Sequence, residues 1–154
     1  MSNAIISLKP RHVNNVLDGT KTVELRSRPV NLCPGTRLWI YSTLPDGFIG
    51  AVATIDKIHM SSPNNIWRKY SNQIAISKKE YDGYVLGKEK VSAILLTDIK
   101  KIEPAISLDV LRRDTSNFHP PQFFKKLSPN APLLDYLSET IKLGSLVNPI
   151  RDFC

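Results

Sequence analysis

The chain has 154 residues, of which 42% are hydrophobic, and a net charge of +7 at neutral pH. This length suits one domain with a single hydrophobic core, so we expect residues 1–154 to form one domain in which residues 128–154 are a C-terminal extension. No apolar run approaches the ~20 residues of a membrane-spanning helix, and Ala4–Ile6 is too short for a signal-peptide core. The composition therefore predicts a cytoplasmic protein with no membrane contact.

The positive charge is concentrated near the N-terminus. Residues 1–40 contain six basic and two acidic side chains, a net charge of +4, whereas residues 102–154 contain six of each. A basic surface attracts polyanions such as nucleic acid, because binding releases counterions. Many small proteins are basic without binding nucleic acid, so the charge alone leaves both interpretations open.

The cysteine and histidine spacing argues against a metal site. Cys33 and Cys154 lie far apart in the sequence, and we expect both to be free thiols in a reducing compartment. The histidines His12, His59 and His119 fall in separate predicted elements, so no pair has metal-ligand spacing. The sequence predicts no metal, and nothing in it indicates a cofactor.

The first elements in the chain form a strand–helix–strand unit. Residues 5–8 are expected to form a strand, Pro10 suits the first turn of a helix, and Gly19 suits its end. The second strand is expected over residues 20–26, where the apolar residues Val23 and Leu25 alternate with Thr22, Glu24 and Arg26. One face of this strand therefore packs into the core, and the other carries charge.

The later elements follow from turn and capping signals. Arg37 to Ser42 is predicted as a central strand covered on both faces. The turn at 44–47 leads into a returning strand at 48–59 with a bulge at Gly50. We then expect helices at 63–70 and from 78 to Gly83 or Gly87, a strand at 91–102, a short helix at 107–113, irregular backbone at 118–132 and a helix at 133–143.

Strands outnumber long helices, which favours an α+β fold with a closed or partly closed barrel and helices over its openings. The apolar phase of each strand predicts one shared core. Its expected members are Ile6, Leu8, Val23, Leu25, Leu38, Ile40, Val52, Ile94 and Leu96.

Three segments resemble the ASCH domain of the PUA-like superfamily. They are SLKP at 7–10, GTKTVELR at 19–26, and the Pro-Gly turn at 34–35 that leads into LWIYS at 38–42; PPQ at 120–122 is a weaker echo. The resemblance covers residues 5–127. It implies a small PUA-like β-barrel flanked by short helices, with a cleft beside the first helix that holds RNA or a nucleotide.

Charged residues fall at the joints of the first unit, where they form either ordinary surface ion pairs or one concave site. If Lys21 and Arg26 bind phosphate or a base, replacing either with Ala should weaken RNA or nucleotide binding and leave thermal stability nearly unchanged, because exposed ion pairs contribute under about 1 kcal/mol. In a site, Lys21 and Arg26 would bind phosphate or a base edge, Glu24 would accept from an exocyclic amine, and Tyr41 would stack on a base. Trp39 is better explained as core. The full expected ligand-binding set is Lys9, Lys21, Glu24, Arg26, Tyr41, Ser42 and Gln122.

Whether the chain is an enzyme stays open at this stage. Some ASCH proteins hydrolyse acylated cytidine with a lysine that matches Lys21, a threonine three residues later and a glutamate from a later helix. Here the threonine position is Glu24, which would hold the lysine protonated, and Glu80 is explained by a capping box. Metal-independent ribonuclease activity, as in other ASCH proteins, tolerates Glu24 and would use Lys21, Glu24 and Tyr41. A module whose basic face binds a protein partner is a further alternative.

Overall fold

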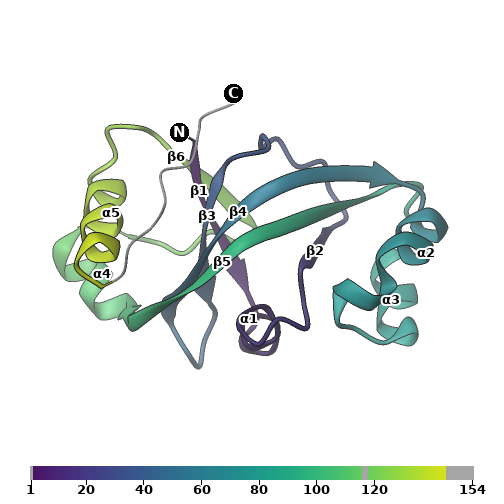
Figure 1. Ribbon diagram of the computed structural model, residues 1–154, viewed down its shortest axis with the longest axis horizontal. Helices are drawn as coiled ribbons and strands as arrows, with labels where there is room; N and C mark the ends of the chain where they lie inside the picture. Colours follow the sequence, from purple (N-terminus) through teal and green to yellow (C-terminus); the bar gives the residue numbers. More distant parts are fainter. Residues whose placement is uncertain (1, 116–117, 145–154) are drawn as a thin grey trace.

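The computed structural model describes residues 2–115 and 118–144 and has a mixed α+β fold (Figure 1). Strands and helices are interleaved along the chain. In order they are β1 (Asn3–Leu8), α1 (Pro10–Leu17), β2 (Val23–Arg26), β3 (Arg37–Ser42), β4 (Phe48–Ser61), α2 (Pro63–Ile74), α3 (Lys78–Val85), β5 (Val91–Ser107), α4 (Leu108–Asp114), β6 (Phe124–Leu127) and α5 (Pro132–Gly144).

The six strands form one curled half-barrel sheet in the order β2-β5-β4-β3-β1-β6. All neighbouring pairs are antiparallel except β1 and β3, which run parallel with α1 and β2 between them in sequence. Strands β2 and β6 are the two edges, so the partly closed form of the predicted barrel is confirmed. In Figure 1 the long strands β4 and β5 cross the molecule, with α2 and α3 at one end and α4 and α5 at the other.

The two long strands bend where their register shifts. One shift lies between Ile49 and Ala51, at the predicted bulge of Gly50. A Cβ atom added at Gly50 would lie 2.9 Å from Cε1 of Phe48, so a larger residue would force that ring to move. The bend allows β5 to pair with β4 along most of its length and with β2 near its start.

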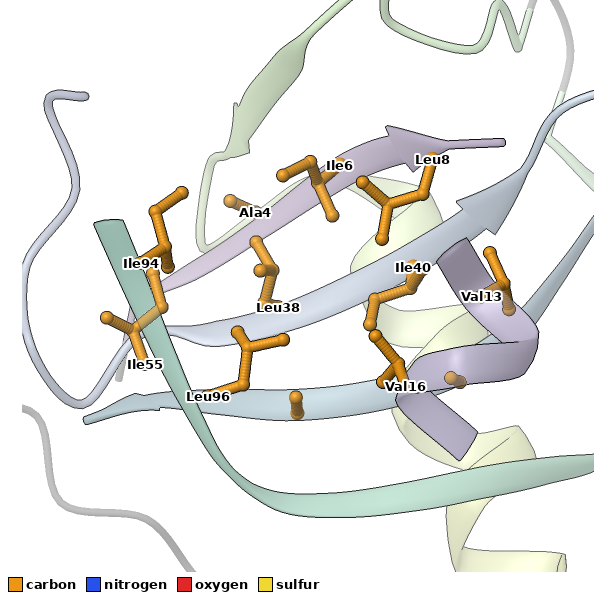
Figure 2. Packing of buried hydrophobic residues seen from close by; sticks show 12 residues of the cluster. Ala4, Ile6, Leu8, Val13, Val16, Leu38, Ile40, Ile55, Ile94 and Leu96 are labelled. Carbon is orange, nitrogen blue, oxygen red and sulfur yellow. The ribbon is translucent and has the colours of Figure 1, made fainter. Parts of the chain in front are cut away.

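All nine predicted core residues are buried, but they do not share one core. Figure 2 shows the first cluster, in which Val13 and Val16 of α1 pack over β1, β3 and β4. Val52 belongs to a second cluster, to which α5 contributes Leu137 and Ile141. Val23 and Leu25 belong to a third cluster with α2 and α3. The prediction of a single core was wrong, because this sheet buries side chains on both faces and β5 extends beyond the first cluster.

The structure differs from the predicted elements where long-range contacts decide the backbone. Strand β2 begins at Val23 because the two amides before it do not donate to a neighbouring strand. The Lys21 amide donates to the carbonyl of Asn15 in α1, and the Thr22 amide donates to the carbonyl of Gln73 in α2. Strand β6 lies within the segment predicted to be irregular. It pairs antiparallel with β1, a partner about 120 residues earlier in the chain.

The thiol prediction for Cys33 was wrong, since this residue is disulfide-bonded. The spacing of cysteines along the sequence indicates metal-ligand motifs, but it does not determine which cysteines lie close enough in the fold to form a disulfide. Cys154 lies outside the described residues. None of the helices in the described ranges is both long and apolar enough to span a membrane.

Candidate RNA-binding cleft

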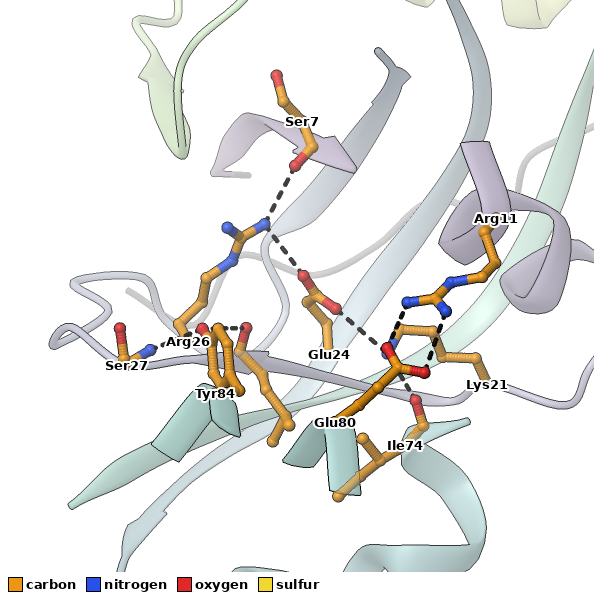
Figure 3. A network of polar contacts seen from close by, with 10 residues as sticks. Ser7, Arg11, Lys21, Glu24, Arg26, Ser27, Ile74, Glu80 and Tyr84 are labelled. Atoms are coloured by element: carbon orange, nitrogen blue, oxygen red, sulfur yellow. Dashed lines mark hydrogen bonds and ion pairs between the residues drawn. The ribbon is translucent and has the colours of Figure 1, made fainter. Parts of the chain in front are cut away.

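A cleft of about 500 Å³ opens where the end of β1, α1, β2 and α3 meet. Its walls also include Gln122 and Phe123, which precede β6. Four of the expected ligand-binding residues besides Gln122 line it, namely Lys9, Lys21, Glu24 and Arg26. Figure 3 shows the polar contacts at its floor.

Lys21 is the most buried charged side chain in the cleft, with 2% of its surface exposed. Its position just before β2 frees it from the strand pleat. Its Nζ donates a 2.7 Å hydrogen bond to the carbonyl of Ile74 at the end of α2 and lies 3.3 Å from Oε1 of Glu24. Burial lowers the pKa of Lys21 below its usual value, and the Glu24 carboxylate opposes that shift. An ammonium has three donors, so one remains for a ligand.

Glu24 and Arg26 lie on one face of β2, as strand alternation predicted. The second oxygen of Glu24, Oε2, is 3.1 Å from the Arg26 guanidinium, which also donates to the carbonyl of Ser7 in β1 at 3.2 Å. Glu24 is only 8% exposed, so the alternative of ordinary surface ion pairs was wrong. The buried Nε of Arg26 has no acceptor among the described residues.

Comparison with known proteins identifies the family. The model of a family described as domain of unknown function DUF365 matches residues 3–112. The chain is 35% identical over 148 residues to an ASCH domain-containing ribonuclease of Zymomonas mobilis, covering 96% of this chain and 94% of that protein. The chain belongs to the ASCH domain family. The ASCH crystal structure from Zymomonas mobilis has a TM-score of 0.82 and 32% identity, covering 95% of this chain and 98% of that one.

A shorter similarity involves a ribosomal protein. The ASCH domain is 31% identical over 93 residues to large ribosomal subunit protein uL22 of Ureaplasma parvum, covering 59% of this chain and 29% of that protein. The first relative and its crystal structure span nearly all of the chain, and they confirm the resemblance that the sequence motifs indicated.

The rim of the ASCH cleft carries a second ion pair. Arg11 of α1 donates to both carboxylate oxygens of Glu80 in α3, at 3.1 and 2.7 Å. The helix cap of the capping box expected at Glu80 is present, since the Ser77 hydroxyl accepts from the Glu80 amide at 3.1 Å. The Glu80 carboxylate, however, pairs with Arg11, which lowers the pKa of Glu80. The capping box therefore explains only the backbone of Glu80, and its side chain belongs to the cleft.

His12 lines the cleft and was not among the expected site residues. Its ring is half-buried, and its buried Nδ1 has no hydrogen-bond partner in the described part of the chain. Burial lowers the pKa of His12, and the nearby Lys21 adds to the shift while Glu24 and Glu80 oppose it. The missed signal was its place in the first turn of α1, directly after the Lys9 that was expected in the site.

Tyr41 and Ser42 do not line the cleft, contrary to expectation. Tyr41 is 2% exposed and packs edge-to-face against Phe118, with ring centroids 6.4 Å apart, in the second core cluster. Ser42 is fully buried and donates to Oδ2 of Asp46 at 2.7 Å. Alternation along β3 places Tyr41 on the face of Trp39, which is core as predicted. Within the described ranges, no three His, Cys, Asp or Glu side chains are grouped as a metal site would need.

Proposed function

We propose that this ASCH domain binds RNA in the cleft and cleaves it there. The observation that carries the proposal is the convergence of three basic side chains, Lys9, Arg11 and Arg26, around a buried Lys21–Glu24 pair in one cleft of about 500 Å³. The sequence similarity to a protein named as an ASCH domain-containing ribonuclease supports the same function. A phosphodiester chain supplies the anions that such a cleft attracts.

Phosphate binding uses the cations whose donors are not fully engaged. Lys9 is exposed at the start of α1, and the Arg26 side chain, which is 15% exposed, lines the cleft. Arg11 is held by Glu80 at an exposed ion pair that a phosphate replaces at little cost. Because the contacts are electrostatic, affinity for RNA should fall steeply as salt is raised.

Cleavage uses the buried groups next to these cations. The ribose 2′-oxygen attacks the adjacent phosphorus, the bond from phosphorus to the 5′-oxygen breaks, and the products are a 2′,3′-cyclic phosphate and a free 5′-hydroxyl. The lowered pKa of His12 keeps its imidazole neutral near pH 7, so it accepts the 2′-hydroxyl proton. Lys21, kept protonated by Glu24, supplies a proton to the leaving oxygen.

Hydrolysis of acylated cytidine is a second candidate, because Glu80 from a later helix lines the same cleft as Lys21. It is the weaker one. With Glu24 at 3.3 Å and the Ile74 carbonyl at 2.7 Å, the surroundings of Lys21 favour an ammonium over the free amine that a base or nucleophile requires.

The test is cleavage of an end-labelled single-stranded RNA in EDTA by wild type and Lys21→Met. We expect a fall of about 10²- to 10⁴-fold in the variant, the usual contribution of one acid–base group. Lys57→Met, which removes an exposed lysine from β4 outside the cleft, is the matched control and should cleave normally. Absence of both cleavage and salt-dependent RNA binding in wild type would refute the proposal. Deacylation of N4-acetylcytidine without RNA cleavage would favour the second candidate.

A further inference from the structure

The segments around β1 carry basic side chains and no acidic ones. β1 pairs with β3 on one side and with β6 on the other. Residues 2–17, 27–42 and 118–134 contain these strands and the turns beside them, and none of these residues is an aspartate or a glutamate. Their basic residues are Lys9, Arg11, Arg28, Arg37, Lys125 and Lys126, of which only Arg37 is buried. A polyanion on this surface therefore meets cations and no carboxylate from these segments.

Three of the exposed cations, Arg28, Lys125 and Lys126, lie outside the cleft and form no ion pair with any described residue. Elsewhere on the surface, Lys78 and Lys101 each pair with a carboxylate of their own element. An unpaired cation has no carboxylate to give up when a phosphate binds, and the release of counterions from a polyanion then favours association. These three side chains are therefore suited to bind an external anion.

The three cations begin where the cleft ends. Phe123 lines the cleft, and the guanidinium of Arg28 lies 4.9 Å from the centre of its ring. β6 starts at the next residue, which places Lys125 and Lys126 about 7 and 10 Å beyond Phe123 along an extended chain. Figure 1 shows β6 beside β1, at an edge of the sheet where its outer side has no strand partner among the described residues. The positive surface of the cleft therefore continues along an open edge.

Protection of the sheet edge is the simpler role for the two lysines of β6. Charged side chains on an edge strand oppose pairing with another chain, and lysine is common there. This role accounts for Lys125 and Lys126 but not for Arg28, which lies in the segment between β2 and β3. It also does not require acidic residues to be absent from all three segments. A binding surface for a polyanion accounts for both observations.

We infer that RNA leaving the cleft continues along β6, where Arg28, Lys125 and Lys126 contact its backbone phosphates. This inference rests on the proposed function and adds a second binding surface to it, so it concerns RNA that is too long for the cleft alone. An acidic protein segment would also meet these cations, but their continuity with the cleft favours the ligand that the cleft takes. Contacts to phosphate oxygens carry no sequence information, so this surface adds affinity for RNA of any sequence.

The experiment compares a fluorescent oligouridylate dodecamer with a dinucleotide of the same chemistry, by anisotropy over a salt series. Both probes carry 2′-O-methyl riboses, which prevent cleavage by the 2′-oxygen. Each phosphate contact of a single strand contributes about 0.7 to the slope of log affinity against log salt. Lys125→Gln together with Lys126→Gln should therefore lower the slope for the dodecamer by about 1.4, which at about 0.1 M salt is roughly a 25-fold loss of affinity. Arg28→Gln should lower the slope by about 0.7, and all these variants should bind the dinucleotide like wild type.

The matched control is Lys57→Gln together with Lys69→Gln, which lowers the net charge equally and removes two exposed lysines of β4 and α2 outside the cleft. It should bind both probes nearly like wild type. Both double variants change only exposed side chains, so their Tm should stay near that of wild type.

The outcomes separate this surface from the cleft. If wild type binds the dodecamer and the β6 double variant matches the control, or loses as much affinity for the dinucleotide as for the dodecamer, the inference is overturned while the proposed function stands. If the β6 variant loses binding of an oligoglutamate peptide but not of RNA, the surface serves an acidic protein and the inference is likewise overturned. If wild type binds neither RNA probe, both the inference and the proposed function are overturned.

Discussion

Replacing Glu24 by glutamine should destabilise the protein strongly, because it leaves the Lys21 ammonium buried without a counter-charge. Removing one partner of a buried ion pair costs about 3–5 kcal/mol. The glutamine oxygen still accepts one hydrogen bond, so we expect a loss near the lower value. For a domain of this length, about 3 kcal/mol corresponds to a fall in Tm of roughly 6–12 °C. That is a large share of the ~5–15 kcal/mol by which native domains are stable.

The dependence on pH distinguishes this mechanism from a loss of packing. Without Glu24, the pKa of Lys21 in the folded state falls further, whereas in the unfolded chain it stays at its ordinary value. Between these two pKa values the unfolded state binds more protons, so stability rises with pH by up to ~1.4 kcal/mol per unit. The deficit of Glu24→Gln should therefore shrink between pH 7 and pH 9.5.

Urea unfolding followed by tryptophan fluorescence at both pH values measures these effects. Glu103→Gln is the matched control, because Glu103 is 76% exposed in its side chain and pairs with Lys101 at 3.6 Å. An exposed pair of this kind contributes under about 1 kcal/mol. A loss for Glu24→Gln no larger than for the control, with no change between pH 7 and pH 9.5, would show that the Lys21 charge is not buried in solution.

Three further outcomes are expected. Because the pKa of His12 is lowered in the folded protein, the unfolded chain takes up a proton first as pH falls, and the free energy of unfolding should decline below about pH 6.5. In urea unfolding, His12→Gln should flatten this decline. An unchanged dependence on pH in the variant would contradict the prediction. In the same assay, loss of the helix cap in Ser77→Ala should lower the free energy of unfolding by about 0.5–2 kcal/mol, whereas Glu80→Gln, at an exposed pair with Arg11, should unfold like wild type. A larger loss of stability in Glu80→Gln than in Ser77→Ala would argue against these roles. In calorimetric titrations, Glu24→Gln should lose discrimination between cytidine and uridine nucleotides, because an amide can rotate to satisfy either base edge; equal affinities for both ligands in wild type would remove Glu24 from base recognition.

The elements that the sequence predicted well are those fixed by neighbouring residues. Ser62, Ser77 and Ser107 each cap the helix that follows them, with side-chain oxygens accepting from the amide three residues on. Gly19, with a φ of 87°, follows the end of α1 as its stop signal indicated. These features depend on local hydrogen bonds and backbone freedom, so a short window of sequence contains the information.

The features that were missed depend on contacts between distant segments. Strand β6 exists because β1 offers it an edge, and the burial of Lys21 depends on the carbonyl of Ile74, 53 residues later. Tyr41 was placed in the site because an aromatic ring can stack on a base, but a period of two does not say which face of β3 adjoins the cleft. His12 was considered only as a metal ligand, although its position in α1 brings it to the cleft.

The charged network at the cleft floor links three elements, β1, β2 and α2. Through Arg26 and Lys21, Glu24 is linked to the Ser7 carbonyl of β1 and the Ile74 carbonyl of α2. Apolar side chains of similar volume often stabilise a fold as well as a buried ion pair does, so stability alone is a weak reason for charge here. Donors held in place before the ligand arrives are what an anion-binding site requires. Because the same atoms support both fold and site, binding by variants of Lys21 or Glu24 has to be measured well below their Tm, where lost affinity reports on the cleft and not on unfolding.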